Sequence, residues 1–183
     1  GDLMKLLLPD SGRLQEEEAD YRNRHNLTSH KPALPLYDEN DAKAALKLLH
    51  TVKNNGEFVK VCEGFSASFR VAGHILGASQ VLVTMDGAKE DGSDVRFLFS
   101  GDLGHYDQPI VNDPAAPPNC DYLMCESTYG NRLHGNESAE DQFVKVIQEA
   151  IGRKGPVLIP AFAIGRTQEI LYMIRELEDE KRI

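Results

Sequence analysis

The sequence predicts an α/β fold in which an antiparallel-rich β-sheet with helices is followed by a helix-strand-helix unit. Residues 57–125 contain five short β-rich runs separated by turns, and residues 137–152 carry apolar side chains at helical spacing. Residues 156–160 form a wholly apolar run ahead of a further helical pattern. A chain of 183 residues with 41% hydrophobic content is long enough to bury a core.

The first part of the chain predicts two helices. Residues 2–8 form an apolar helical stretch, which turn residues and an acidic segment follow. Residues 26–35 contain two prolines and indicate a surface loop. Residues 38–52 carry alanines and leucines at helical spacing, with Asp38 or Asn40 available as the N-cap.

The β-rich part predicts a meander. Glu63 and Gly64 are expected to form the turn of a first hairpin, and the glycine- and charge-rich residues 86–94 to join a second antiparallel pair. The expected strands are residues 58–62, 65–72, 80–85, 95–100 and 121–125.

After the meander the pattern becomes helix, strand, helix. Ser138 and Asp141 have the spacing of a capping box at the start of the helix over residues 137–152. Residues 156–160 predict a strand buried on both faces, and Thr167 is a candidate cap for the last helix.

Composition limits the classes of function. A net charge of −9 argues against bulk affinity for nucleic acid, although a phosphate-binding patch needs only a few basic residues. The three cysteines have no C-x-x-C spacing, which favours buried free thiols in a reducing compartment. No apolar run reaches the length of a membrane span, so we expect a cytoplasmic protein without a membrane partner.

His74, Asp102 and Glu126 each follow an apolar run in or beside a glycine-bounded turn. The small neighbours of His74 leave its imidazole free to reach a metal, and the carboxylate of Asp102 can bridge two ions about 3.5 to 4 Å apart. Glu126 is either a base that lies next to the metal ligands or a surface charge at the end of a strand. Singly, each has a simpler explanation in a hydrogen-bonded turn or a strand end. Together they indicate a metal centre.

Four segments carry a family resemblance. A-G-H-I-L-G-A at 72–78, F-S-G-D-L-G at 99–104, C-E-S-T-Y-G-N-R-L-H at 125–134 and V-L-I-P-A-F-A-I-G-R-T-Q-E-I-L at 157–171 resemble the metallo-β-lactamase superfamily, in particular its β-CASP branch of RNA- and DNA-processing nucleases. The most similar pattern is that of ribonucleases resembling the endonuclease subunit of the cleavage and polyadenylation specificity factor. The resemblance implies a partial metallo-β-lactamase αββα fold over residues 1–135 and the start of a β-CASP domain over residues 136–183.

The resemblance also implies roles. His74 and Asp102 match zinc ligands, with Asp102 bridging two Zn²⁺ ions, and Asp102 and Glu126 are the candidate catalytic residues. The implied activity is zinc-dependent hydrolysis of phosphodiester bonds in single-stranded RNA, which the protein would hold by its phosphate backbone. Ser127, Tyr129 and Arg166 are the candidate substrate-binding residues.

The H-x-H-x-D-H signature of the family is absent from the sequence. We therefore expect an internal fragment that is inactive alone and holds metal weakly or not at all. Two alternatives stay open: another hydrolase of this fold acting on small esters or thioesters, and a non-catalytic RNA-binding scaffold. His134 is either a residue at the edge of the site or part of a surface loop, and a homo-oligomer is possible.

Overall fold

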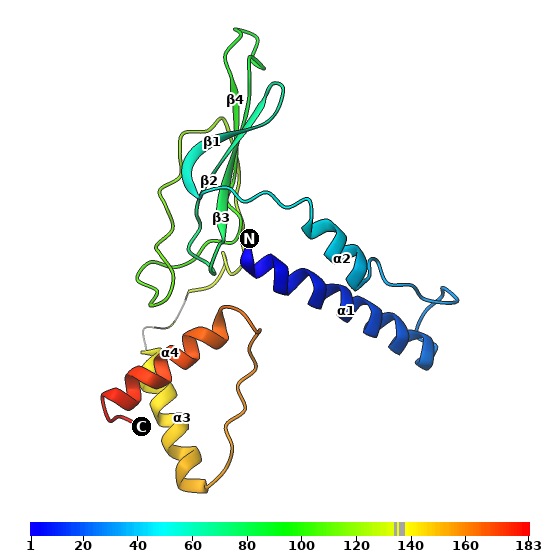
Figure 1. Cartoon of the computed structure of the whole chain (residues 1–183). Helices are drawn as coiled ribbons and strands as arrows, with labels where there is room; N and C mark the ends of the chain where they lie inside the picture. The colour runs from blue at the N-terminus through cyan, green and yellow to red at the C-terminus, as the bar shows by residue number, and fades with distance from the viewer. Residues whose placement is uncertain (134, 136–137) are drawn as a thin grey trace. The chain divides into compact units, whose positions relative to one another are not determined.

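The computed structural model describes residues 1–133, 135 and 138–183, which form two compact units, Gly1–Val52 and Lys53–Ile183 (Figure 1). The first unit contains the helices α1 (Asp2–His25) and α2 (Glu39–Leu46). The second contains a five-stranded sheet and the helices α3 (Ala139–Arg153) and α4 (Arg166–Asp179). Among the described residues, no helix combines the length and the apolar character needed to cross a bilayer.

Helix α1 is much longer than the predicted helix over residues 2–8, because it continues through Pro9 and the acidic segment. Side-chain pairs one turn apart support this continuation. Arg13 contacts both Asp10 and Glu17 at 2.5 Å. Such pairs are individually weak, but they lie along the helix face where the sequence suggested a turn.

Helix α2 begins as predicted and ends early. Asp38 is its N-cap, with a reciprocal capping box to Asp41. The predicted helix over residues 38–52 stops at Leu46, and Leu48 beyond it is 78% exposed. A longer helix would bury little apolar surface at this point, so burial gives little stabilisation to an extension.

The sheet has the order β1-β2-β3-β4-β5, and each strand pairs with its neighbour in the sequence. The hairpin turn at Gly64 is confirmed, with a left-handed φ of 75°. The first three pairings are antiparallel, whereas β5 runs parallel to β4. The strands are β1 (Asn55–Cys62), β2 (Phe65–Val71), β3 (Ser79–Met85), β4 (Val95–Phe99) and β5 (Tyr122–Met124).

The parallel β4–β5 pair corrects the predicted simple meander. A chain that enters β5 in the direction of β4 must first return along the sheet, and the proline-containing segment between the two strands provides this return. Asp121 fixes the end of this return segment by two hydrogen bonds with Arg96. The Asp121 N–H donates to the carbonyl of Arg96 at 2.9 Å, and the Asp121 carboxylate accepts from the Arg96 N–H at 2.8 Å.

The centre of the sheet buries a mixed set of side chains. Leu82 and Leu98 lie opposite each other on β3 and β4 and are almost fully buried. Gln80 is also buried, and its amide donates to the carbonyl of Ala115 at 2.6 Å. The Ala115 N–H in turn donates to the carbonyl of Val71 at 2.9 Å. These bonds hold the return segment against the ends of β2 and β3.

Helix α3 confirms its predicted start, because the Ser138 hydroxyl accepts a hydrogen bond from the Asp141 N–H. Two other predictions for this region are wrong. Residues 156–160 form no strand, and Leu158 is 89% exposed. The N-cap of helix α4 is Gly165 and not the predicted Thr167. The Gly165 N–H donates to the Gln168 side chain, while the Thr167 hydroxyl donates to the carbonyl of Phe162, before the helix.

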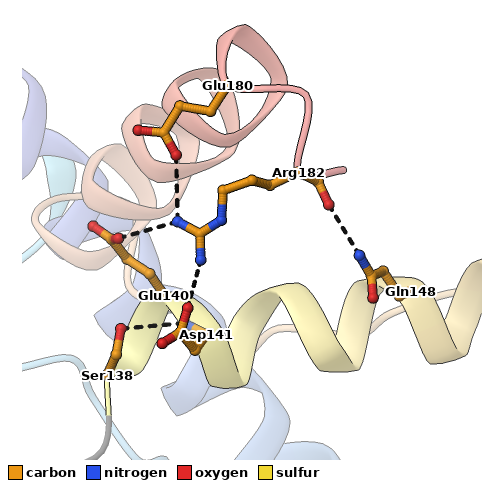
Figure 2. A network of polar contacts seen from close by, with 6 residues as sticks. All are labelled: Ser138, Glu140, Asp141, Gln148, Glu180 and Arg182. Carbon is orange, nitrogen blue, oxygen red and sulfur yellow. Dashed lines mark hydrogen bonds and ion pairs between the residues drawn. The ribbon is translucent and has the colours of Figure 1, made fainter.

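Arg182 links the segment after α4 to the start of α3 (Figure 2). Its guanidinium contacts the carboxylates of Glu140, Asp141 and Glu180 at 3.5, 2.5 and 3.3 Å. The Gln148 amide donates to the Arg182 carbonyl at 3.0 Å. Two acidic residues in the first turn of α3 thus meet one cation from the end of the chain.

The cysteines are free, as predicted, but they are not buried. Cys62 and Cys125 are exposed and Cys120 is half-exposed. Cys62 ends β1 and Cys125 follows β5, which are the two outer strands of the described sheet. Side chains at such positions have sheet neighbours on one side only.

Candidate active site

The three candidate residues lie at one edge of the sheet. Strands β2 and β4 are both antiparallel to β3 and therefore run in the same direction as each other, and β5 runs parallel to β4. The carboxyl ends of β2, β4 and β5 consequently share an edge. His74 follows β2, Asp102 follows β4 and Glu126 follows β5.

The turns that carry His74 and Asp102 are in direct backbone contact. Gly73 and Leu103 form an isolated antiparallel bridge, and the Gly104 N–H donates to the carbonyl of Ala72 at 2.8 Å. A Cβ atom on Gly104 would overlap the Gly73 carbonyl oxygen, far inside van der Waals contact. Glycine at position 104 is therefore a condition for this approach of the two turns.

Glu126 joins the third turn to the second. Its carboxylate Oε1 accepts a hydrogen bond from the Leu103 N–H at 2.5 Å, next to Asp102. Its own N–H donates to the Ser100 hydroxyl at 3.0 Å, and that hydroxyl donates to the Gly101 carbonyl at 2.7 Å. Through these bonds Glu126 fixes the backbone on both sides of Asp102.

The environment of Glu126 lowers the pKa of its carboxyl. The hydrogen bond from Leu103 is the largest cause; burial opposes it, and Thr128 and an electrostatic interaction with His74 act in the same direction as Leu103. The interaction with His74 shows that the imidazole lies within electrostatic reach of this carboxylate. A carboxyl with a lowered pKa accepts a proton poorly near neutrality, so the arrangement suits an orienting role better than that of a general base.

His74 and Asp102 are both exposed at the rim of the sheet. Among residues 1–133, 135 and 138–183, no group of three His, Cys, Asp or Glu side chains is placed to hold a metal ion. A zinc site takes about four ligands, so the described residues do not make up a complete zinc site.

The predicted substrate-binding residues fall into two places. Ser127 and Tyr129 lie in the exposed turn directly after Glu126. Arg166 begins α4 and forms an ion pair with Glu169 at 3.0 Å, with its side chain 70% exposed. Within the described part of the chain, no hydrogen bond or ion pair links Arg166 to the three turns, so its role stays a prediction.

Two further residues belong to this site although the sequence interpretation did not single them out. Ser100 is buried and connects Glu126 to the turn of Asp102. Arg132 places its guanidinium over the ring of Tyr129, 5.7 Å from the ring centroid. Both lie inside the recognised segments, and Arg132 follows Tyr129 by three residues in the E-S-T-Y-G-N-R run. His134 lies outside the described residues.

The chain is similar to curated proteins over most of its length. It is 29% identical over 173 residues to Ribonuclease TTHA0252 of Thermus thermophilus and 30% identical over 160 residues to Cleavage and polyadenylation specificity factor 73 of Drosophila melanogaster. It is 31% identical over 178 residues to Probable RNase MJ4 of Methanocaldococcus jannaschii. No protein-family model matches the chain.

These similarities cover most of this chain but a much smaller share of each relative. They include 94%, 86% and 95% of this chain, but only 34%, 22% and 37% of the three relatives in the same order. The chain therefore spans less than two fifths of the length of each of these relatives.

Proposed function

Because this chain belongs to the family of the ribonucleases and cleavage factors to which it is similar, the β-CASP branch of the metallo-β-lactamase superfamily, we propose that it forms part of a phosphodiester hydrolase that processes RNA. One observation carries the proposal. The turns after β2, β4 and β5 are bonded to one another at one sheet edge, with a histidine and two carboxylates on them. Rigid strands can aim such side chains at one point.

In the proposed enzyme, His74 and Asp102 would help to hold zinc, which would activate the attacking water, and the Asp102 carboxylate would offer two oxygens as ligand atoms. Two side chains are too few to hold an ion alone, and residues 1–133, 135 and 138–183 contain no group of three candidate ligands, so we propose that the remaining ligands come from outside this chain. The greater length of the relatives supports this part of the proposal. Glu126 keeps the Asp102 turn in place through the Leu103 N–H.

The proposed substrate is single-stranded RNA, held by its phosphate backbone. Ser127 can donate a hydrogen bond to a phosphate oxygen, and Arg166 can contact one through two donors. The net charge of −9 means that binding rests on local contacts, which makes affinity moderate and dependent on salt. The domain boundary near residue 135 and a cytoplasmic location belong to the same proposal.

Cleavage by the full-length protein tests this function. A labelled single-stranded RNA is incubated with the protein before and after removal of metal by a chelator, and again after zinc is added back. We expect cleavage, its loss on chelation and its return with zinc, whereas this chain alone stays inactive under the same conditions. A single-stranded DNA and a thioester are tested separately as alternative substrates.

The alternatives give different outcomes in the same experiment. Hydrolysis of the thioester without cleavage of RNA would replace the nuclease with a small-ester hydrolase. Binding of RNA without any hydrolysis would replace it with a scaffold protein. RNA cleavage that persists after complete metal removal would contradict the proposed zinc ligands.

A further inference from the structure

The turn after Glu126 carries an aromatic ring that the packing of the chain does not explain. Tyr129 is 61% exposed, and the turn around it is closed by two backbone hydrogen bonds. The Gly130 N–H donates to the Ser127 carbonyl at 3.0 Å, and the Arg132 N–H donates to the Tyr129 carbonyl at 2.9 Å. Thr128 interacts with the Glu126 carboxylate, so the turn is anchored to the candidate site.

The backbone of Tyr129 is in an unfavourable conformation for its residue type. Its φ of 58° lies in the left-handed region, where a side chain with a Cβ is strained and where glycine or asparagine is better suited. A mostly exposed ring gains little packing energy to offset this strain. A non-glycine residue held in this region next to a candidate site suggests a functional role for its side chain.

Arg132 gives the ring a cationic neighbour. Its guanidinium lies over the Tyr129 ring at 5.7 Å from the centroid, within the range of a cation–π interaction. Among the described residues no carboxylate forms an ion pair with Arg132, in contrast to Arg166, which is paired with Glu169. An exposed aromatic ring beside an unneutralised planar cation matches the chemistry of a nucleotide, which combines a flat base with an anionic phosphate.

We propose that Tyr129 stacks against a base of single-stranded RNA and that Arg132 contacts the flanking phosphate, which places the strand beside the sheet edge of His74, Asp102 and Glu126. This site rests on the proposed function, because it assumes that RNA reaches that edge. Stacking is tolerant of sequence, since every base has a flat face. Tyr129 and Arg132 therefore position the RNA strand without selecting one base.

Substitution of Tyr129 by asparagine separates stacking from stability. Asparagine removes the ring and suits the left-handed backbone, so the Tyr129→Asn protein should be at least as stable as the wild type. Binding is measured by fluorescence anisotropy on the full-length protein, with a short labelled phosphorothioate oligoadenylate that resists cleavage. An abasic oligomer of the same length carries the same phosphates without bases.

We expect Tyr129→Asn to weaken binding of the oligoadenylate about tenfold or more, with little effect on the abasic oligomer. Tyr129→Phe should keep the preference for the oligomer with bases, because it keeps the ring. Arg132→Gln should weaken binding of both oligomers and reduce the salt dependence, because it removes a phosphate contact. Tyr106→Asn, which alters another exposed tyrosine that is 65% accessible, is the matched control and should bind as the wild type does.

The outcomes distinguish this site from the proposed function. Equal affinity of wild type and Tyr129→Asn for the oligoadenylate, with RNA cleavage intact, would overturn the stacking site and leave the nuclease in place. Equal losses for both oligomers would also overturn stacking. A wild-type protein that neither binds nor cleaves RNA would overturn the proposed function and this site together.

Discussion

The Glu126 carboxylate accepts a hydrogen bond of 2.5 Å from the backbone N–H of Leu103, the residue that follows Asp102. This bond joins the ends of two parallel strands, β4 and β5, at the edge of the sheet. It also fixes the turn on which Asp102 lies. Glu126 can therefore affect the candidate site without contacting substrate, by holding the backbone of its neighbour.

Glu126→Ala should reduce RNA cleavage by the full-length protein about 10- to 100-fold, the usual effect of losing a group that orients a metal ligand. Glu126→Gln should cost less, because its amide oxygen still accepts from Leu103. Amide hydrogen exchange at Leu103 should become faster in Glu126→Ala. Glu63→Ala, at the exposed hairpin turn, is the control; unchanged exchange and cleavage in Glu126→Ala would contradict the orienting role.

Gly104→Ala should destabilise the protein by about 3 kcal/mol, because its Cβ would meet the backbone oxygen of Gly73, which cannot move without breaking the turn contact. Gly152→Ala is the matched control, because Gly152 lies in helix α3 and a Cβ added there would have no atom within 4 Å. It should stabilise the protein by about 0.5 to 1 kcal/mol. Urea unfolding measures both changes. A Gly104→Ala protein as stable as the wild type would show that the two turns can separate.

The sequence allowed the five strands of the sheet and the three turns after β2, β4 and β5 to be predicted, because the apolar runs and their glycine boundaries are local signals. Glu63 and Gly64 predicted the turn of the first hairpin, and the structure has the turn at these two residues. The parallel direction of β5 was not predictable, because it depends on the path of the return segment and on the hydrogen bonds between Asp121, at the end of that segment, and Arg96 on β4. The role of Ser100 was likewise not visible, since it depends on which strand lies beside β4.

Asp121 provides a pH-dependent contribution to stability. Its hydrogen bond with Lys89, at 2.6 Å, and the N–H of Arg96 lower the pKa of its carboxyl below the ordinary 3.8, although burial acts in the opposite direction. A carboxyl whose pKa is lower in the folded state stabilises the fold above its unfolded pKa. This stabilisation is lost as the pH falls through the folded pKa.

Asp121→Asn should therefore be less stable than the wild type near neutral pH, with a difference that shrinks as the pH falls below the ordinary value of 3.8. Urea midpoints across this range measure the difference. Lys89→Gln should raise the pKa of Asp121 towards its ordinary value, because it removes the largest cause of the shift. A difference that grows on acidification would contradict this account.

Arg182→Gln should lower the thermal midpoint of the protein, because Glu140 and Asp141 lose their shared cation in the network of Figure 2. The effect should diminish at high salt, since these carboxylates are exposed and screened. Arg175→Gln is the control, because Arg175 forms one longer contact, of 3.8 Å, to Asp179. Equal effects of the two substitutions would show that the network adds nothing beyond a single surface pair.

Residues 156–160 show where local pattern reasoning fails. Their apolar character predicts a strand buried on both faces, but strand formation requires a hydrogen-bonding neighbour. The described sheet ends at β5 and does not include this segment, so Leu158 stays exposed. The error at α1 has the opposite cause, because Pro9 looked like a boundary while pairs such as Arg13–Glu17 support the helix.

Cleavage of single-stranded RNA by the Asp102→Asn variant of the full-length protein tests the central claim most directly. Asparagine keeps the size of the side chain and removes the charge that a bridging ligand needs. Asp107→Asn, an exposed aspartate of the same segment with a left-handed φ that asparagine tolerates, is the control. We predict that cleavage falls to background in Asp102→Asn and is retained in Asp107→Asn. Undiminished cleavage by Asp102→Asn would contradict the assignment of this sheet edge as the active site.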